Sequence, residues 1–376
     1  MLQPENKVQI ANVQKPKMKR TTLILLIILG VVVIGAGVAG YFYYVKKGSS
    51  NTALKIQDQT VASKLDGLKV AKDKANRHPL AIIIENHPDA RPQIGLAQAS
   101  IVYEAISEGG ITRFMAVYGP EDAEKVGPVR SARTYFVDWA SSFNAFYAHC
   151  GGNLDALDKI KADKILDLDQ FALGDAAYWR EPQAGKASEH TLYTSTAKLY
   201  QAAQEKGWSP TGDFTALKFR EPVQTATTTS TSTTPTAATP VAPQKITVDF
   251  SSPTYRVDWQ YDAASNSYLR SMAGSIHKDA ASGGQLSVKN IIVQEVERSE
   301  AITAINEQGY AMKTVGEGKA KIFIENTMIE GTWKKPTRTD RTLFYDSTGK
   351  EIEFIPGHFW IEIAPPEVFD KIQVGV

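Results

Sequence analysis

Two arginines flank the point where an amphipathic helix is expected to begin, in the segment Arg130-Ser131-Ala132-Arg133. Apolar residues in 132–142 recur at the spacing of one helix face, and Ser131 is placed to cap that helix. A helix N-terminus already carries free N–H groups and partial positive charge, so two guanidinium groups there are unfavourable unless an anion lies nearby. We therefore predict that this segment binds an anionic group through backbone N–H groups and bidentate guanidinium bonds.

Acidic side chains of the same chain could supply that negative charge. Two apolar runs, 101–106 and 112–118, are separated by a Gly-Gly pair and predict a hairpin. Glu104, Glu108 and Arg113 are expected on one face of the hairpin, whether its loop has two or four residues. An internal ion-pair network and a ligand site both remain open, and one can include the other. As a glycosidase pair the two glutamates fit poorly, because four strand residues span roughly 13 Å.

Three histidines, His87, His149 and His190, lie at the ends of predicted strands or in loops. If they converge beside Arg130, they are suited to general acid–base chemistry. Asn86 precedes the first of them and joins the same candidate ligand-binding set. The spacing of the 6 histidines matches no recognised zinc motif, so we expect neither a metal nor a cofactor.

A pair of glycines, Gly151 and Gly152, offers a second place for an anion. It lies between a predicted strand at 145–150 and a helix that Asn153 is placed to cap. Open α/β sheets often bind ligands at such a position. The spacing is not that of a Walker or dinucleotide-binding loop, so a structural turn is the default interpretation and a phosphate loop the alternative.

The elements that must position these residues divide at a Thr/Pro-rich segment. Residues 79–220 alternate short apolar strands with amphipathic helices, which predicts an α/β domain. Residues 221–244 predict a flexible linker, because they are too polar to bury a core. Residues 245–366 predict a β-rich, mainly antiparallel domain, so we expect an N-terminal and a C-terminal lobe. The strands expected after the linker are 246–250, 255–261, 268–272, 290–296, 319–325, 328–333, 342–345 and 359–363.

An uncharged apolar segment precedes the folded region. Residues 21–45 are long enough to cross about 30 Å of hydrocarbon as one helix. Lysine and arginine are more numerous before this segment than after it, which predicts a cytoplasmic tail at 1–20 and an extracytoplasmic remainder. Residues 46–78 are expected to form a polar stalk. A signal peptide cleaved near Gly37-Val38-Ala39 is the alternative to a retained single-pass anchor.

Composition sets outer limits on function. With 43% hydrophobic and 22% charged residues, the chain is expected to fold rather than remain disordered. The formal net charge is +1, so no overall field favours nucleic acid, and we expect no nucleic-acid partner. The chain has 1 cysteine, Cys150, which excludes an internal disulfide bond.

Several short sequence motifs follow one another in a characteristic order along the chain, and the most specific is Gly127-Pro128-Val129-Arg130-Ser131-Ala132-Arg133. The others are Ala81–Gln93, Ile101–Glu104, Glu108–Phe114, His149–Gly152, His190–Ser195, Tyr268–Arg270, His277–Asp279, Asn290–Gln294 and Ile329–Lys334. Together they resemble the YerB-like family of bacterial envelope proteins, over about residues 64–365.

The resemblance implies an architecture rather than an activity. Members of this family look like lipoproteins with an N-terminal and a C-terminal lobe. Two features of this chain depart from that pattern. No cysteine lies near the apolar segment for lipid attachment, so a membrane span takes its place, and the Thr/Pro-rich linker looks like an insertion between the lobes.

We therefore predict a membrane-anchored, extracytoplasmic protein of the cell envelope that binds a ligand and is not an enzyme. The ligand would be anionic, such as a peptidoglycan fragment or a wall polymer. One alternative is an envelope hydrolase or transferase that uses His149 or His190 with Glu104. Another is a protein-interaction scaffold, which a large exposed apolar patch on the second lobe would indicate. The protein partner of such a scaffold is not indicated by the sequence.

Overall fold

The computed structural model describes residues 37–38, 40–41, 60–221, 244–303 and 305–375. The chain divides into two compact units, Met1–Thr60 and Val61–Val376. The second unit contains the elements that bear on function.

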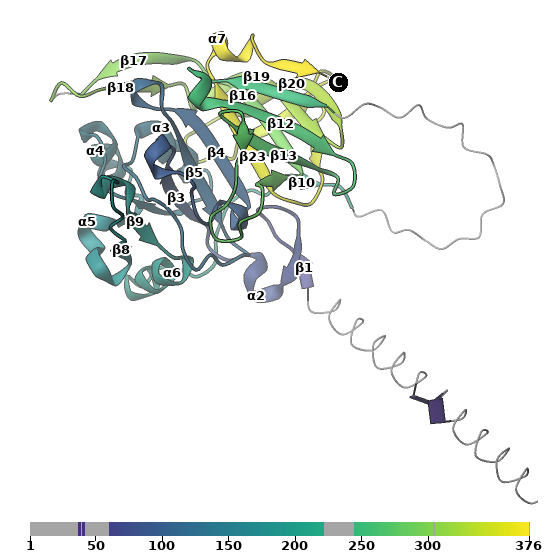
Figure 1. Ribbon diagram of the computed structural model, residues 1–376, viewed down its shortest axis with the longest axis horizontal. Helices are drawn as coiled ribbons and strands as arrows, with labels where there is room; N and C mark the ends of the chain where they lie inside the picture. Colours follow the sequence, from purple (N-terminus) through teal and green to yellow (C-terminus); the bar gives the residue numbers. More distant parts are fainter. Residues whose placement is uncertain (1–36, 39, 42–59, 222–243, 304, 376) are drawn as a thin grey trace, which may run out of the picture. The chain divides into compact units, whose positions relative to one another are not determined.

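A ten-stranded sheet forms the centre of this unit (Figure 1). Its strands come from both sides of the linker, and they meet where β23 (Phe359–Ala364) pairs with β4 (Ile101–Ile106). The two halves of the chain therefore share one sheet, where separate lobes were expected. On one side of this pair lie β16 (Asn290–Glu295), β19 (Gly316–Ile324), β20 (Thr327–Lys335) and β21 (Leu343–Asp346). On the other lie β5 (Thr112–Tyr118), β3 (Leu80–Glu85), β6 (Phe146–His149) and β7 (Leu166–Asp169).

The two strands at the junction show why the halves merge. Every residue of β23 and of β4 is buried. Both strands have neighbours on each side and are covered on both faces, which is where continuous apolar runs are found. Such a run predicts a central strand, but it does not specify which other strand it pairs with.

Strand direction brings several strand ends to one edge of the sheet. β16, β23 and β4 are parallel, β3, β6 and β7 are parallel, and β5 runs antiparallel between β3 and β4. β3, β4, β6 and β7 therefore all end at the same edge, at Glu85, Ile106, His149 and Asp169. We refer to this as the carboxyl edge. It is the usual ligand-binding edge of open α/β sheets.

The two faces of the sheet are covered differently. On one face, Ile83 and Tyr103 pack with α3 (Thr134–Ser141) and α4 (Leu154–Ala162). On the opposite face, the sheet packs against α6 (Thr196–Glu205) and against a second sheet. We call these the helical face and the sheet face.

The second sheet is antiparallel and comes from the chain after the linker. Its order is β14-β13-β12-β11-β24, with β15 paired to β13. Its last strand, β24, lies beyond residue 366, so this half of the fold is longer than the sequence predicted. The bounds are β11 (Lys245–Asp249), β12 (Arg256–Asp262), β13 (Ser267–Met272), β14 (Ser275–Ile276), β15 (Ser287–Val288) and β24 (Gln373–Gly375).

Short elements complete the fold. The two-stranded pairs are β1 (Thr60–Ala62) with β2 (Lys69–Ala71), β8 (Tyr178–Arg180) with β9 (Leu192–Thr194), β10 (Lys218–Phe219) with β22 (Glu353–Phe354), and β17 (Arg298–Ile302) with β18 (Gln308–Met312). The short α-helices are α2 (Lys72–Ala75), α5 (Gln170–Leu173) and α7 (Pro366–Phe369). The 3-10 turns are η1 (Pro88–Ala90), η2 (Leu96–Gln98), η3 (Glu108–Gly110), η4 (Gly174–Ala176), η5 (Ser188–His190) and η6 (Pro253–Tyr255).

Most elements predicted from local pattern are confirmed. Each of the strands expected after the linker has a counterpart, although β23 is parallel to both of its neighbours rather than antiparallel. The predicted cap at Asn153 is also present, and Ser195 caps α6 in the same way. The side chain of Asn153 accepts the N–H of Ala156 at 3.3 Å, and Ser195 Oγ accepts the N–H of Lys198 at 3.2 Å. Local capping chemistry is therefore readable from the sequence.

The predicted stalk is partly folded. Leu65 is 3% exposed and Asp66 is fully buried. A carboxylate oxygen of Asp66 accepts the hydroxyl of Ser100 at 2.5 Å, and its carbonyl oxygen accepts the N–H of Gly357 at 2.8 Å. The folded region therefore begins near residue 60 rather than 79. It is held by a few specific contacts that leave no periodic pattern in the sequence.

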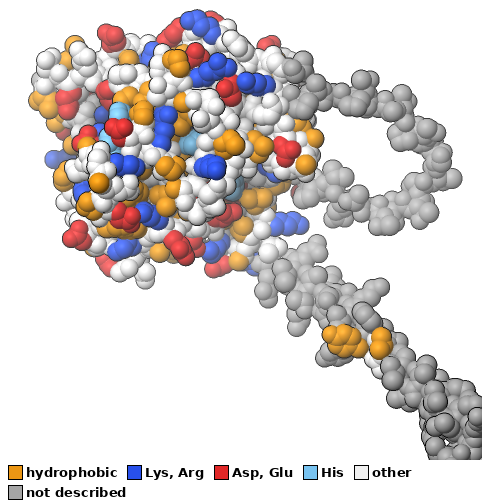
Figure 2. All heavy atoms as spheres, viewed as in Figure 1, with side chains coloured by type: hydrophobic (Ala, Val, Ile, Leu, Met, Phe, Trp, Pro, Cys, Tyr) orange, Lys and Arg blue, Asp and Glu red, His pale blue; other side chains and the backbone are white. Residues whose placement is uncertain are grey.

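The predicted span at 21–45 lies almost wholly outside the described residues, as does linker segment 222–243. Within the ranges that the structure describes, no helix has both the length and the apolar character needed to cross a bilayer. On the folded unit, acidic and basic side chains are interspersed over the face shown in Figure 2, in keeping with the net charge of +1.

Candidate functional site

The end of β3 divides the predicted site residues between the two faces of the sheet. Side chains alternate along a strand, so Glu85 follows Ile83 onto the helical face, and Asn86 follows Ile84 onto the sheet face. Glu85 contacts Arg130, whereas Asn86 contacts Met272 of the second sheet. Residues expected in one site therefore belong to separate groups.

Arg130 lies on the helical face at the carboxyl edge. Its backbone is fixed by two bonds, one from its N–H to the carbonyl of Ile83 at 2.9 Å and one from the N–H of Cys150 to its own carbonyl at 3.0 Å. Its guanidinium group pairs with Glu85, which is 2% exposed, and lies 3.6 Å from Glu189, which is 51% exposed. The Arg130 side chain is itself 28% exposed. It thus has one buried internal partner and an open side.

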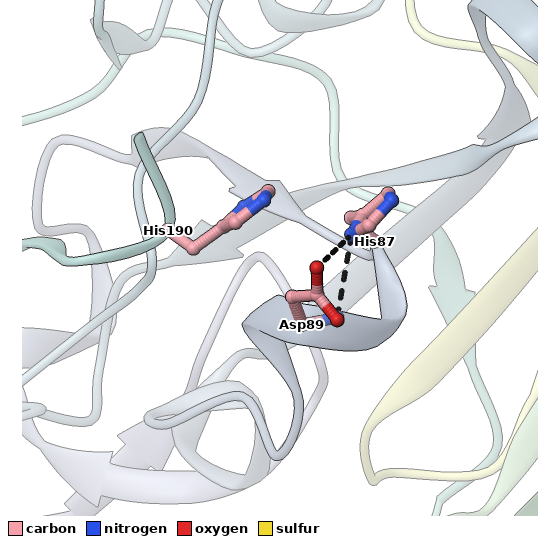
Figure 3. Close-up of side chains that lie close together, drawn as sticks. All are labelled: His87, Asp89 and His190. Carbon is pink, nitrogen blue, oxygen red and sulfur yellow. Dashed lines mark hydrogen bonds and ion pairs between the residues drawn. The ribbon is translucent and has the colours of Figure 1, made fainter. Parts of the chain in front are cut away.

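Two of the predicted histidines, His87 and His190, lie close together (Figure 3), and His190 is near the Glu85 carboxylate. The rings of His87 and His190 stack with centroids 4.9 Å apart and planes 8° from parallel. Nδ1 of His190 lies 3.9 Å from a carboxylate oxygen of Glu85, and Nδ1 of His87 lies 3.6 Å from Asp89. Two of the three histidines considered from the sequence therefore lie beside the Arg130–Glu85 pair, and the third, His149, does not.

A second group of charges lies on the same face. Arg133 forms an ion pair with Glu108, and Arg113 lies 3.8 Å from the same carboxylate. Partial burial alone would raise the pKa of Glu108, but hydrogen bonds and charge from Arg133, together with the charge of Arg113, lower that pKa to about 2. The Arg133 side chain is 13% exposed. This arginine is thus paired internally, as the internal-network alternative foresaw.

Ser131 does not cap the helix. The N-cap position of α3 is Arg133, and it makes no side-chain capping bond. Ser131 Oγ instead accepts a hydrogen bond from Arg133 at 3.0 Å, and its carbonyl oxygen accepts one from Arg113 at 3.0 Å. The segment before the helix is extended because Ala132 forms a parallel bridge to Gly152. The predicted anion site at the helix N-terminus is therefore not formed as expected.

Glu104 lies apart from these residues, contrary to the prediction. The hairpin loop has five residues, closed by a bond from the N–H of Ser107 to the carbonyl of Ile111 at 2.6 Å. Glu104 is consequently opposite Phe114, and Arg113 is opposite Ala105. An odd loop length shifts the register by one and moves a side chain to the other face. Glu104 therefore points to the sheet face, while Glu108 and Arg113 remain on the helical face.

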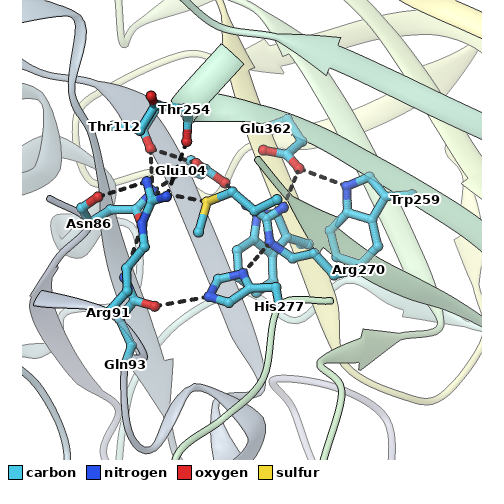
Figure 4. Close-up of polar contacts among 12 residues, drawn as sticks. Asn86, Arg91, Gln93, Glu104, Thr112, Thr254, Trp259, Arg270, His277 and Glu362 are labelled. Atoms are coloured by element: carbon cyan, nitrogen blue, oxygen red, sulfur yellow. Dashed lines mark hydrogen bonds and ion pairs between the residues drawn. The ribbon is translucent and has the colours of Figure 1, made fainter. Parts of the chain in front are cut away.

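On the sheet face, Glu104 joins a buried polar network that links the two halves of the chain (Figure 4). Arg270, from β13, is fully buried and pairs with Glu104 at 2.5 Å and with Glu362 at 3.5 Å. Its Nε donates to Nδ1 of His277 at 3.0 Å. The other nitrogen of that ring lies 2.9 Å from Gln93 Oε1, which fixes it as the protonated nitrogen.

The protonation states in this network follow from burial. Burial raises the pKa of Glu362 well above its ordinary value, and the charge of Glu104 raises it further. Burial likewise lowers the pKa of His277 well below 6.5, and the charge of Arg270 adds to this. The neutral forms of Glu362 and His277 are therefore favoured, beside the ion pair between Arg270 and Glu104. No open ligand position is indicated here, and we interpret the network as structural.

The network continues to β3 through Asn86. The Asn86 side chain donates to Thr112 Oγ1 at 2.6 Å and accepts from Gln93 at 2.9 Å and from Arg91 at 3.1 Å. Asn86 is fully buried, so it orients neighbouring groups and does not face a ligand. The sequence pattern did not predict this role. The available signal was a glutamate inside each of two otherwise apolar strands, Glu104 and Glu362.

His149 and the two glycines form a structural turn. His149 is fully buried, with Nδ1 2.8 Å from the carbonyl of Gly151 and Nε2 2.9 Å from Asp167. The N–H of Gly151 donates to Asp169 at 2.8 Å, so it is already satisfied. Gly151 has φ +57°, and a Cβ on Gly152 would lie 3.2 Å from Ala132. The default interpretation of this turn is supported, and the phosphate-loop alternative is not.

The proposed acid–base combination is not assembled. Glu104 lies on the sheet face with Arg270, whereas His149 is held by Asp167 and His190 lies near Glu85 on the helical face. The arrangement therefore does not favour a hydrolase that uses these three residues.

A mixed α/β protein whose two chain halves share a sheet is thus the class that the fold defines. Residues 65–209 match the model described as "Protein of unknown function (DUF3048) N-terminal domain", and residues 246–361 match the corresponding C-terminal domain. The chain belongs to this family, as the resemblance of its motifs to YerB-like proteins predicted. The matched ranges lie on the two sides of the linker.

The relatives agree with this assignment. The chain is 31% identical over 304 residues to "Putative lipoprotein YerB" of Bacillus subtilis (strain 168), over 80% of this chain and 85% of that protein. The crystal structure of the YerB protein from Bacillus subtilis is similar, with a TM-score of 0.71 and 29% identity. The similarity covers 84% of this chain and 100% of the other.

Proposed function

We propose that this chain is a protein of the cell envelope whose extracytoplasmic folded unit binds an anionic group at Arg130. Membership of the family supports the envelope location, because the relative in Bacillus subtilis is named as a lipoprotein. The apolar segment 21–45 supports a retained single-pass anchor, with the N-terminus in the cytoplasm.

The observation that carries the ligand proposal is the partial exposure of Arg130 at the carboxyl edge. Its inner side is fixed by the buried Glu85, and among the described residues the further ion pair of its guanidinium group is with Glu189, an exposed acid at 3.6 Å. An exposed ion pair at this distance is worth little, so a ligand carboxylate or phosphate can replace Glu189. The guanidinium fork then has a pre-oriented position from which to form bidentate bonds.

The balance of charge on the helical face also favours an anion. Arg113, Arg130 and Arg133 face two buried or half-buried acids, Glu85 and Glu108. Among the buried and half-buried groups, three positive charges therefore oppose two negative ones, while the exposed acids Asp89 and Glu189 are screened by solvent. In addition, Nε of Arg113 is buried without a hydrogen-bond partner among the described residues. A bound anion or its water would satisfy such a group.

The ligand is expected to be a peptidoglycan fragment or an anionic wall polymer. The test measures binding of a muropeptide with free carboxylates, and separately of a polyglycerol phosphate, to the full-length chain in detergent. EDTA is present throughout. Arg130→Lys keeps the charge beside Glu85 but loses the guanidinium fork, and is expected to weaken binding at least tenfold.

The matched control is Arg256→Lys. Arg256 lies on β12, is 44% exposed and pairs with Asp258 at 3.2 Å. Its replacement is expected to leave the affinity unchanged. Equal affinities of the wild type and Arg130→Lys for both probes would contradict the proposal, as would equal losses in Arg130→Lys and Arg256→Lys.

A further inference from the structure

Three potential metal ligands converge beside the Arg130–Glu85 pair. One ligand atom each from His87, Asp89 and His190 lie within 4.8 Å of one another. Figure 3 shows that they come from two segments far apart in sequence, the turn after β3 and the end of η5. Spacing alone does not reveal such a site, which is why no metal was expected from the sequence.

The first segment places two of the ligands on one short turn. His87 is the N-cap of η1, and Pro88 follows at its first position, where proline favours the turn. Asp89 lies next to it, and its backbone N–H donates to Nδ1 of His87 at 3.3 Å. The side chains of His87 and Asp89 are 35% and 65% exposed, so both have room to rotate.

His190 is the fixed member of the group. It is 6% exposed, yet its ring forms no hydrogen bond with any residue in the described parts of the chain, and its buried Nδ1 has only the more distant Glu85 carboxylate nearby. Buried imidazoles normally have at least one such bond. Glu85 lies 3.9 Å from Nδ1, in the position of a carboxylate that orients a metal-binding histidine from behind.

We propose that His87, Asp89 and His190 bind a divalent first-row transition ion, with zinc as the reference ion. Two imidazoles and one carboxylate form a ligand set that zinc and its neighbours prefer. Magnesium and calcium prefer oxygen ligands alone, so they are not expected to compete. This site does not depend on anion binding at Arg130.

The geometry requires only a small closure. With metal–ligand bonds of about 2.1 Å, tetrahedral ligand atoms lie roughly 3.4 Å apart. The separations between the three ligand atoms, which are now up to 4.8 Å, therefore have to shorten by up to about 1.4 Å. The stacked rings must also tilt so that their lone pairs converge, and the exposed His87 can do this while His190 stays in place. A fourth coordination position remains for water or for an anionic group.

The test is titration of the full-length, untagged protein with zinc chloride in excess magnesium, followed by calorimetry. One zinc ion per chain with a micromolar or lower Kd is expected. His87→Ala and Asp89→Asn change exposed side chains and should preserve the fold, which circular dichroism of the metal-free variants verifies. Each is expected to weaken zinc binding at least tenfold. The thermal midpoint should rise with zinc in the wild type but not in His87→Ala.

The matched control is His358→Ala, because His358 also lies near a carboxylate, Glu121 at 3.6 Å, but outside this group. Its zinc affinity should equal that of the wild type. Zinc binding that is absent, or that is unchanged in His87→Ala, overturns the proposal. Arg130→Lys separates the two sites, since it should lose anion binding in EDTA while it retains zinc binding.

Discussion

Replacing Arg270 with methionine is expected to lower the free energy of unfolding by about 3–5 kcal/mol. Methionine is similar in length and is apolar, so the change removes the charge with little loss of volume. Glu104 would remain fully buried with no cationic partner, and Nδ1 of His277 would lose its donor. The cost comes mainly from this uncompensated buried carboxylate.

The structure explains why this loss of stability is expected to be larger than that from breaking an exposed ion pair. Both Arg270 and Glu104 are 0% exposed, so solvent does not screen them. The guanidinium carbon also lies 4.2 Å from the ring centre of Trp360 and 5.1 Å from that of Trp259, which adds cation–π attraction. An exposed pair such as Lys313–Glu297, with side chains 49% and 70% exposed, contributes about 0–1 kcal/mol by comparison.

The assay is equilibrium unfolding in urea, read by tryptophan fluorescence. Lys313→Met is the matched control and is expected to change the free energy of unfolding by less than about 0.5 kcal/mol. The double variant Glu104→Gln with Arg270→Met removes both charges and should recover part of the loss. A loss of less than about 1 kcal/mol in Arg270→Met would refute the reasoning. So would a double variant that is less stable than Arg270→Met by as much again as Arg270→Met is less stable than the wild type.

Two further predictions concern local charge and capping. Above pH 4.5, Glu108→Gln should destabilise the fold by about 1–2 kcal/mol, because a pKa of about 2 in place of 4.5 corresponds to about 3 kcal/mol before solvent screening is considered. The folded-state pKa of Glu108 is lowered, so this stabilisation is lost as pH falls from 4.5 through 2. The difference in free energy of unfolding between the wild type and Glu108→Gln, measured in urea, should therefore be smaller at pH 3.5 than at pH 7. Asn153→Ala removes the cap of α4 and should cost about 1 kcal/mol in the same assay. Gln308→Ala, at an exposed position of β18, is the control, and no loss in Asn153→Ala would contradict the capping role.

Local sequence pattern was sufficient to predict the strands, but not to predict which face of the sheet each side chain occupies. The strands at 101–106 and 112–118 were predicted from apolar runs alone, and the structure has them. The placement of Glu104 was wrong because it depends on loop length. Five loop residues, rather than two or four, put it opposite Phe114 and on the other face from Arg113. A one-residue difference in a turn therefore decided the composition of the site.

The candidate site was predictable only in part. His87 and His190 lie near Glu85, the partner of Arg130, whereas His149, the third histidine of the hypothesis, is held in a structural turn. Glu85 was missed, since as the last residue of an apolar strand it gives no local sign that it faces Arg130. Asp89 was missed for a related reason, because its relation to His190 depends on tertiary packing of a segment about 100 residues away.

The pairing of β23 with β4 determines what a break in the chain would do. Since the two halves share hydrogen bonds along that junction, and Arg270 reaches across to Glu104, a cut between residues 222 and 243 severs the polypeptide without separating the sheet. The segment only has to join the two chain ends on either side of it, and the entropic cost of closing a loop grows slowly with the length of the loop. This stretch is therefore a site where relatives can gain or lose residues, and where a foreign sequence can be inserted, at small cost to the assembled core.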